Sequence, residues 1–265
     1  MTSSVGTPLP IVDLHSHLVP GVDDGTATVA ESLDALSALH QEDVRSLVTT
    51  PHLLVPHLVG DEALDRELER HRRAFDNLAA SCEGRADLPA IALGQEIWAP
   101  NATVIRRVVT RPDIGLAGGR YLLVEFGFEL LGNHNDVVCE VQAAGRRMII
   151  AHPERYHYLD GHNPIDVMRT WRDLGALLQV NVGSLTGHYR RSSPASESLA
   201  WQMVELDLID VLATDHHGPR REGVSPREAL NALIARGQRM LAERAMVETP
   251  GMISRDEPAE SRLPG

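Results

Sequence analysis

This chain of 265 residues is poor in cysteine and has neither a long apolar run nor a basic stripe. Its two cysteines, Cys82 and Cys139, stand in unrelated predicted helices, which argues against a disulfide framework and indicates a reducing compartment. No apolar run approaches the roughly 20 residues of a membrane span, so the chain is not expected to be membrane-embedded. Residues 1–10 lack the basic start of a signal peptide. We therefore expect a cytoplasmic protein.

The net charge of −12 is not offset by any basic cluster. We expect no nucleic-acid partner, although a metal site can bind phosphate whatever the net charge is. Hydrophobic residues make up 43% and charged residues 23%, as in ordinary soluble domains. Histidine is the exception, because several of its 13 residues stand beside Asp, Gly or Pro in predicted loops, where they do not serve core packing.

The segment Asp13-Leu14-His15-Ser16-His17 follows a short apolar run that predicts a buried strand. Side chains alternate along a strand, so the two histidines point to the same side and can close on one metal ion. An isolated His-x-His is equally consistent with two ordinary histidines. However, Asp23-Asp24-Gly25 follows shortly, and five later predicted strands each run into a His, Glu or Asp. This accumulation favours a site for several metal ions.

Hydrophobic periodicity predicts seven strands, at 9–14, 45–50, 88–93, 121–124, 148–151, 177–182 and 211–214. Helices are predicted between and after them, at 28–40, 61–82, 135–144, 164–174, 197–207 and 226–247. Such alternation is typical of parallel strands joined by crossover helices. It predicts a TIM-like (β/α) barrel with fewer than eight strands, and an open doubly wound sheet is the alternative.

One domain is expected over residues 10–248, with residues 1–9 and 249–265 as flexible tails. In a parallel barrel the C-terminal ends of the strands converge on one face, where active sites lie. Ligand-type residues stand at these predicted ends: His15, His17, His52, Glu96, Glu125, His152, Asp215 and His217. We therefore expect the metal site at the C-terminal ends of the strands.

Eight stretches carry a family likeness: DLHSH at 13–17, PGVDDG at 20–25, TPH at 50–52, GQEI at 94–97, VEF at 124–126, AHPERY at 151–156, QVNVGSLTG at 179–187 and TDHH at 214–217. They resemble the PHP (polymerase and histidinol phosphatase) superfamily, and within it the bacterial manganese-dependent protein-tyrosine phosphatases found with capsule and exopolysaccharide genes. The resemblance implies a distorted (β/α)7 barrel, usually with three metal ions. It also implies nine metal ligands: His15, His17, Asp24, His52, Glu96, Glu125, His152, Asp215 and His217.

A ligand set of imidazoles and carboxylates without cysteine suits two or three divalent ions, manganese first, with iron or zinc as alternatives. Glu125, on a central strand, is the expected bridging carboxylate. A water shared by two such ions yields hydroxide near neutral pH, which attacks phosphorus in line. The proton donor is left open between a metal-bound water and His216. Asp13 is expected to orient a ligand imidazole, and Asp23 is equally consistent with a turn residue.

Arg155 is expected to hold phosphate by a forked pair of hydrogen bonds, and a surface salt bridge to Glu154 is the alternative. The resemblance implies a further arginine after the final Asp-x-His, where Arg220 and Arg221 both stand slightly early. Three aromatic residues are candidates for a wall around a phosphotyrosine ring or for ordinary packing: Trp98, Tyr156 and Tyr158. Three polar residues are candidates for a pocket floor or an inward polar layer of the barrel: Gln179, Asn181 and Ser184.

The expected function is hydrolysis of phosphomonoesters, with phosphotyrosine in a protein, such as a bacterial kinase tail, as the substrate. Neither cysteine stands in a Cys-x5-Arg loop, which excludes a cysteine-based tyrosine phosphatase. One alternative keeps the chemistry and takes a small ester such as histidinol phosphate. The other is a non-catalytic metal-binding or exonuclease-like module of a larger assembly, which the acidic balance and the single-domain length disfavour.

Overall fold

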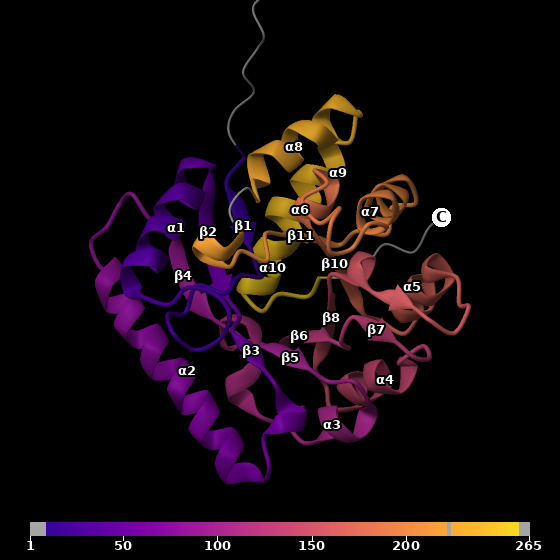
Figure 1. Cartoon of the computed structure of the whole chain (residues 1–265), viewed down its shortest axis with the longest axis horizontal. Coiled ribbons are helices and arrows are strands. Elements are labelled where there is room, and N and C mark those ends of the chain that lie inside the picture. The colour runs from indigo at the N-terminus through magenta and orange to yellow at the C-terminus, as the bar shows by residue number, and fades with distance from the viewer. Residues whose placement is uncertain (1–8, 222–223, 260–265) are drawn as a thin grey trace, which may run out of the picture.

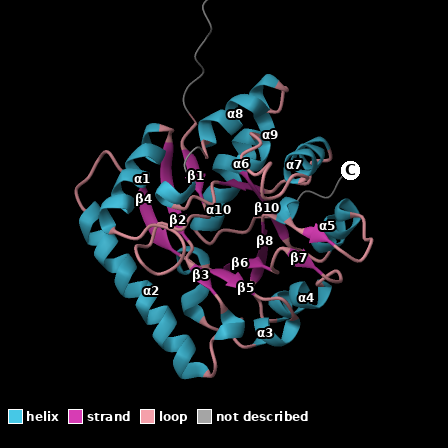
Figure 2. Ribbon diagram, in the orientation of Figure 1, coloured by secondary structure: helices cyan, strands magenta, loops and turns pink. Residues whose placement is uncertain are grey.

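The computed structural model describes residues 9–221 and 224–259, and these form a barrel of parallel strands surrounded by helices (Figure 1). Figure 2 shows the strands gathered in the middle of the molecule with the helices outside them. The barrel strands are β1 (Ile11–Asp13), β2 (Val44–Thr49), β3 (His52–Leu53), β4 (Ala90–Leu93), β5 (Glu96–Trp98), β6 (Tyr121–Glu125), β8 (Arg147–Ala151), β10 (Leu177–Asn181) and β11 (Val211–Ala213).

The strands close into a ring. β2 and β3 follow one another across Pro51, and β4 and β5 across Gly94, so each pair acts as one broken strand. The hydrogen-bonded order is β1-β2-β4 in one sheet and β3-β5-β6-β8-β10-β11 in the other, with every pair parallel. A parallel bridge between Ser16 and His216 joins the ends of the first and last strands. Over the described ranges this makes a distorted seven-stranded barrel, as predicted, and the open sheet is excluded.

Two breaks in the strands lie directly before two of the predicted ligands. Pro51 has no N–H to continue a ladder and precedes His52. At Gly94 an added Cβ would lie 2.7 Å from the Leu116 side chain, so a larger residue does not fit before Glu96. The short strands β3 and β5 beyond these breaks were not predicted, because each is too short to show an alternating pattern.

Helices surround the barrel, and the longer ones bury apolar residues in the core between helices and strands. They include α1 (Val29–Gln41), α2 (Asp61–Cys82), α3 (Ala102–Arg106), α4 (Asn135–Ala143), α5 (Pro164–Asp173), α6 (Val182–Leu185), α7 (Ser196–Glu205), α8 (Pro226–Ala235), α9 (Arg239–Glu243) and α10 (Thr249–Ser254). A small parallel ribbon of β7 (Glu129–Leu130) and β9 (His157–Tyr158) stands outside the ring.

The predicted single helix over 226–247 is wrong. α8 ends at Ala235, and Gly237 adopts a left-handed backbone with φ of +76°, which only glycine adopts without strain. The chain then continues through α9, a π-helical turn at Arg244–Glu248 and α10.

The predicted flexible tail from residue 249 is also wrong as far as residue 259. Ile253 in α10 and Ala259 are buried in one apolar cluster with Tyr121, inside the barrel. The Tyr121 hydroxyl donates to the Glu257 carbonyl at 2.8 Å and accepts from the Ala259 N–H at 2.7 Å. Because Tyr121 begins β6, the tail closes the N-terminal end of the barrel, opposite the predicted ligands. Residues 1–8 and 260–265 lie outside the described residues, and so does the prediction for them.

Truncating Ile253 to alanine is expected to lower the free energy of unfolding by about 2–5 kcal/mol, as for other buried isoleucines. The expected fall in melting temperature is several degrees, measured by calorimetry. Met240→Ala on the neighbouring helix α9 is the matched control, because Met240 is 81% exposed. Equal melting temperatures for the two variants would contradict a structural role for α10.

Among the described residues, no helix combines the length and the apolar character that crossing a bilayer requires.

Candidate metal centre

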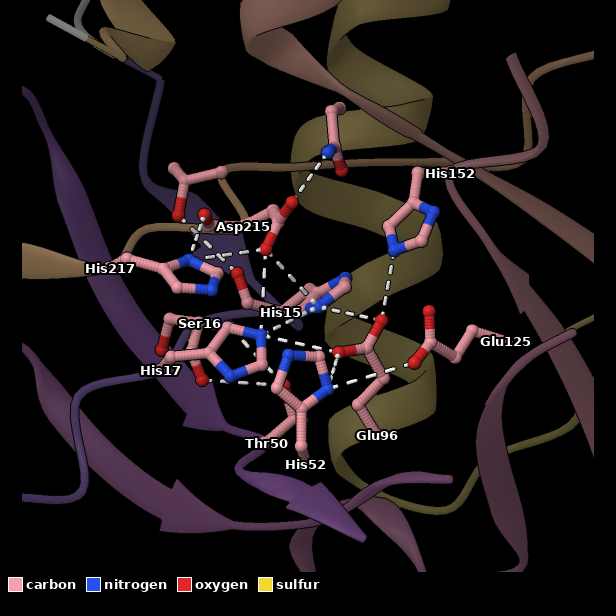
Figure 3. Close-up of polar contacts among 12 residues, drawn as sticks. His15, Ser16, His17, Thr50, His52, Glu96, Glu125, His152, Asp215 and His217 are labelled. Carbon is pink, nitrogen blue, oxygen red and sulfur yellow. Dashed lines mark hydrogen bonds and ion pairs between the residues drawn. The ribbon is translucent and has the colours of Figure 1, made fainter. Parts of the chain in front are cut away.

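The C-terminal ends of the barrel strands converge on one face of the molecule (Figure 3). Each predicted ligand stands in one of these strands or in the loop that follows one. The structure brings all nine side chains into one cluster: His15, His17, Asp24, His52, Glu96, Glu125, His152, Asp215 and His217. Residues spread over about two hundred positions of the chain therefore meet in one place, as the barrel prediction requires.

Glu96 is fully buried at the middle of this cluster. Its Oε1 lies 2.9 Å from His152 Nε2 and 3.3 Å from His15 Nε2. Its Oε2 lies 2.8 Å from His52 Nδ1 and 3.3 Å from His17 Nε2. One carboxylate thus faces four imidazoles at the middle of the cluster.

Glu125, the expected bridging residue, lies at the edge of the cluster. Its Oε1 is 3.8 Å from His52 Nδ1. Two of the groups of side chains that could hold a metal ion contain Glu96, whereas one contains Glu125. The register between β5 and β6 gives the reason, because Glu96 pairs with Leu123. Glu125 therefore stands two residues further along the barrel axis, and Glu96 rather than Glu125 lies at the middle of the cluster.

Buried polar atoms at the centre are arranged as a divalent cation requires. His52 Nδ1 and Glu96 Oε2 lie 2.8 Å apart, yet their geometry makes no hydrogen bond. His17 Nδ1 lies 2.7 Å from Asp23 Oδ2, and a carboxylate oxygen only accepts. A neutral His17 ring therefore carries its proton on Nδ1 and turns the Nε2 lone pair toward the centre. Inward lone pairs mixed with carboxylate oxygens fit manganese, iron or zinc.

The PGVDDG segment contributes two acidic residues, one that orients an imidazole and one that is exposed to solvent. Asp23 is the partner of the His17 imidazole, so it is more than a turn residue. Asp24 Oδ1 lies 3.3 Å from His217 Nε2, and its side chain is 60% exposed, so the centre opens to solvent on this side. At Gly25 an added Cβ would lie 1.9 Å from the His17 carbonyl oxygen, so glycine alone allows this close approach.

At the centre, burial disfavours the charged forms of the side chains, and neighbouring opposite charges favour them. Burial disfavours the charged form of Glu96, but the positive charge of His15 and the imidazoles beside it hold its pKa well below the usual range. Burial likewise opposes protonation of His17, but the carboxylates around it, Asp215 first, raise its pKa well above the usual range. Burial, and then the charge of Glu96, raises the pKa of Glu125 to about 7. Protons and divalent cations thus compete for the same positions.

Arg155 lies buried beside the centre. Its Nη1 donates to Asp215 Oδ2 at 2.8 Å. Its guanidinium carbon lies 4.2 Å from the ring centre of Tyr189 and 5.0 Å from that of Phe128. Because Arg155 is buried, the alternative of a surface salt bridge to Glu154 is wrong.

The loop after β11 carries the remaining candidates. His216 accepts a hydrogen bond on Nδ1 from the Gly218 N–H at 2.9 Å, so a neutral His216 carries its proton on Nε2. Arg220 and Arg221 lie in the 3₁₀ turn Gly218–Arg221. Their side chains lie outside the described residues, so the choice between them stays a prediction.

Phe128 supplies an aromatic face beside the centre, and sequence analysis missed it. Its side chain is 45% exposed, and its ring stacks on His152 with centroids 5.9 Å apart and planes at 14°. Tyr156 is buried, and the Tyr158 hydroxyl donates to a backbone carbonyl below the centre, so these two pack in the core. The only signal for Phe128 in the sequence is its place shortly after the carboxylate that ends β6.

Asp13 does not orient an imidazole, contrary to expectation. It accepts hydrogen bonds from the backbone N–H groups of His15 and Thr214, at 3.3 and 3.0 Å, and so ties the end of β1 to the end of β11. The side chains of Gln179 and Asn181 are fully buried and form an inward polar layer of β10. Ser184 is also buried, but it lies in α6 and its hydroxyl donates to Glu154 at 2.7 Å.

A model of the CpsB/CapC family of capsular polysaccharide synthesis proteins matches residues 11–254. The chain belongs to this family. It is 29% identical over 225 residues to the tyrosine-protein phosphatase YwqE of Bacillus subtilis, covering 84% of each chain. It is 25% identical over 256 residues to the tyrosine-protein phosphatase CpsB of Streptococcus pneumoniae, covering 93% of this chain and 99% of that one. The predicted likeness to capsule-associated tyrosine phosphatases is confirmed.

The fold of the CpsB/CapC family is also found among solved structures. A chain from the crystal structures of YwqE from Bacillus subtilis and CpsB from Streptococcus pneumoniae, described as metal-dependent tyrosine phosphatases, matches with a TM-score of 0.80. The match covers 95% of this chain and 97% of that chain at 23% identity. The fold of 95% of the chain therefore has a counterpart in a solved structure.

Proposed function

We propose that this chain is a metal-dependent phosphatase that removes phosphate from phosphotyrosine in proteins. The observation that carries the proposal is the meeting of nine imidazole and carboxylate groups around Glu96 at the C-terminal face of the barrel. Membership of the CpsB/CapC family and the phosphatase names of its relatives support the choice of reaction and substrate. The two cysteines are free and lie outside this cluster, so a cysteine nucleophile has no support.

The nine side chains are proposed to hold two or three divalent ions, manganese first, with iron or zinc as alternatives. Glu96 would be shared between ions, and Asp24 would serve the ion nearest to solvent. When bound, such ions supply Lewis acidity toward phosphate oxygens and lower the pKa of water. A reduced, cytoplasmic location goes with the proposal, and a tyrosine kinase tail is one possible protein partner.

Arg155 is proposed to hold the phosphate. Asp215 and the two aromatic rings fix its guanidinium at the edge of the centre, so little conformational entropy is lost when it meets an anion. Among the described residues its Nε makes no hydrogen bond, so the guanidinium keeps an unused donor. Arg220 or Arg221 is proposed to approach from the loop after β11.

The deciding experiment strips the protein of metal, restores manganese, and compares a phosphotyrosine peptide with histidinol phosphate. Manganese-restored release of phosphate from the peptide, lost in His15→Ala and Asp215→Ala, is the expected result. Preference for histidinol phosphate would move the substrate to a small ester and keep the site. No release from either ester by metal-loaded protein would refute the phosphatase proposal as stated.

Phe128 is proposed to stack on the ring of phosphotyrosine, because it presents an exposed aromatic face beside His152 and Arg155. Aromatic pairs contribute about 0.5–1.5 kcal/mol, so Phe128→Ala is expected to lower kcat/KM for phosphotyrosine about two- to tenfold. The kcat/KM of this variant for an alkyl phosphate should fall only slightly. Leu131→Ala, at another exposed apolar position, serves as the control. Equal losses for the aryl and the alkyl ester would rule out ring stacking.

A further inference from the structure

We propose that Gln179 and Asn181 of β10 are positioning residues that hold two metal ligands through a hydrogen-bond chain running in one direction, from His15 to Asp215. The inference rests on the proposed metal site. β10 supplies none of the nine ligands, although it lies between β8 and β11, which both lead into ligands. Its two inward amides are fully buried at alternate positions of the strand.

A backbone N–H fixes the orientation of the Gln179 amide. The N–H of His152 donates to Gln179 Oε1 at 3.3 Å, and a backbone N–H can only donate. The same oxygen lies 3.0 Å from His15 Nδ1, so that nitrogen must carry the hydrogen. The Nε2 lone pair of His15 is then the one that faces Glu96 and His17, at 3.3 and 3.2 Å.

The other end of the Gln179 amide fixes Asn181 in turn. Gln179 Nε2 donates to Asn181 Oδ1 at 2.8 Å. Asn181 therefore presents its Nδ2, which donates to Asp215 Oδ2 at 2.8 Å. Because Arg155 also donates to Oδ2, the other oxygen is left for the centre, where Oδ1 lies 3.4 Å from His17 Nε2.

This chain of hydrogen bonds thus sets the tautomer of His15, which follows the first strand, and the rotamer of Asp215, which follows the last strand. These two strands close the barrel, so β10 couples ring closure to the geometry of the centre. Residues that orient metal ligands typically contribute a factor of about 10–100 to metal affinity. We expect a loss of that size when either amide is removed.

The experiment measures the affinity of the full chain for Mn²⁺ by competition with a chelating dye. Gln179→Leu and Asn181→Leu are each expected to bind Mn²⁺ about 10–100-fold more weakly. The direction of the hydrogen bonds can be tested more sharply with carboxylate variants. Gln179→Glu keeps an acceptor for His15 and should recover part of the loss, whereas Asn181→Asp has no donor for Asp215 and should recover none. A purely structural role would not separate the two carboxylate variants in this way.

Ser184→Ala is the matched control, because Ser184 is a buried donor in the same segment whose partner is Glu154. Its Mn²⁺ affinity should match that of the wild type. Nitrogen NMR of the Zn²⁺-loaded protein adds a second readout that needs no substrate. We expect a slowly exchanging His15 Nδ1–H in the wild type and in Gln179→Glu, and its loss in Gln179→Leu.

Leucine variants that bind Mn²⁺ as tightly as Ser184→Ala would overturn the inference, as would recovery by Asn181→Asp. A His15 that carries its proton on Nε2 in wild-type protein would overturn it too. Neither readout depends on phosphate release. Normal metal binding with no phosphatase activity would therefore refute the proposed substrate chemistry alone, and would leave the positioning chain supported.

Discussion

Replacing Glu96 with glutamine is expected to abolish manganese-dependent phosphate release. The carboxylate of Glu96 faces His15, His17, His52 and His152, so its loss removes the ligand that we propose is shared between ions. A glutamine amide keeps the shape, but it brings a nitrogen that cannot bind a cation and removes the negative charge. Metal affinity should fall by more than the roughly 100-fold that loss of a supporting residue causes.

Bound manganese per chain and phosphate release from a phosphotyrosine peptide are the two measurements for this variant. Glu129→Gln is the matched control, since Glu129 is an exposed glutamate on the ribbon strand β7. Unchanged manganese binding in Glu96→Gln would show that the centre is built around another residue. Glu125→Gln should have a smaller effect, because Glu125 lies at the edge of the cluster.

Replacing Arg155 with alanine is expected to lower kcat/KM about 10²–10³-fold at saturating manganese, the usual cost of losing one donor to a developing charge. The guanidinium is held by Asp215, Tyr189 and Phe128, and it has a donor left over for phosphate. Arg155→Lys should recover only part of the activity, because an ammonium group offers charge without the planar fork.

Saturating manganese separates two roles of Arg155, since the residue also contacts the ligand Asp215. Full activity of Arg155→Ala at high manganese would mean that Arg155 acts only by holding Asp215. Persistent loss under that condition would support direct contact with phosphate. Arg190→Ala is a suitable control, because Arg190 is exposed and pairs with Glu197 on the surface.

The barrel and most of the ligand set were predictable because both depend on local patterns. For example, β8 is an apolar segment followed by His152, and this pattern can be recognised in the sequence without knowing which strands lie beside it. Parallel pairing then brings all such ends to one face, so ligands as distant as His15 and Asp215 follow from position alone. The sequence resemblance added Asp24, which follows no strand end.

Other features depend on register and burial, which local patterns do not contain. Glu96 and Glu125 both follow apolar strands, and only the pairing of Glu96 with Leu123 decides which of them lies at the middle. The tail carries Ile253 among polar residues, and its packing against Tyr121 is visible only once the barrel has an open end to cover.

The sequence by itself determined that this is a parallel α/β barrel with imidazoles and carboxylates gathered at one end, because strand periodicity and residue type are properties of short segments. The tertiary structure decided which carboxylate lies at the middle of the cluster, which aromatic ring lies at the opening, and how Gln179 and Asn181 link His15 to Asp215. The physical reason is that hydrogen-bond direction and strand register are set between segments that are far apart in the chain.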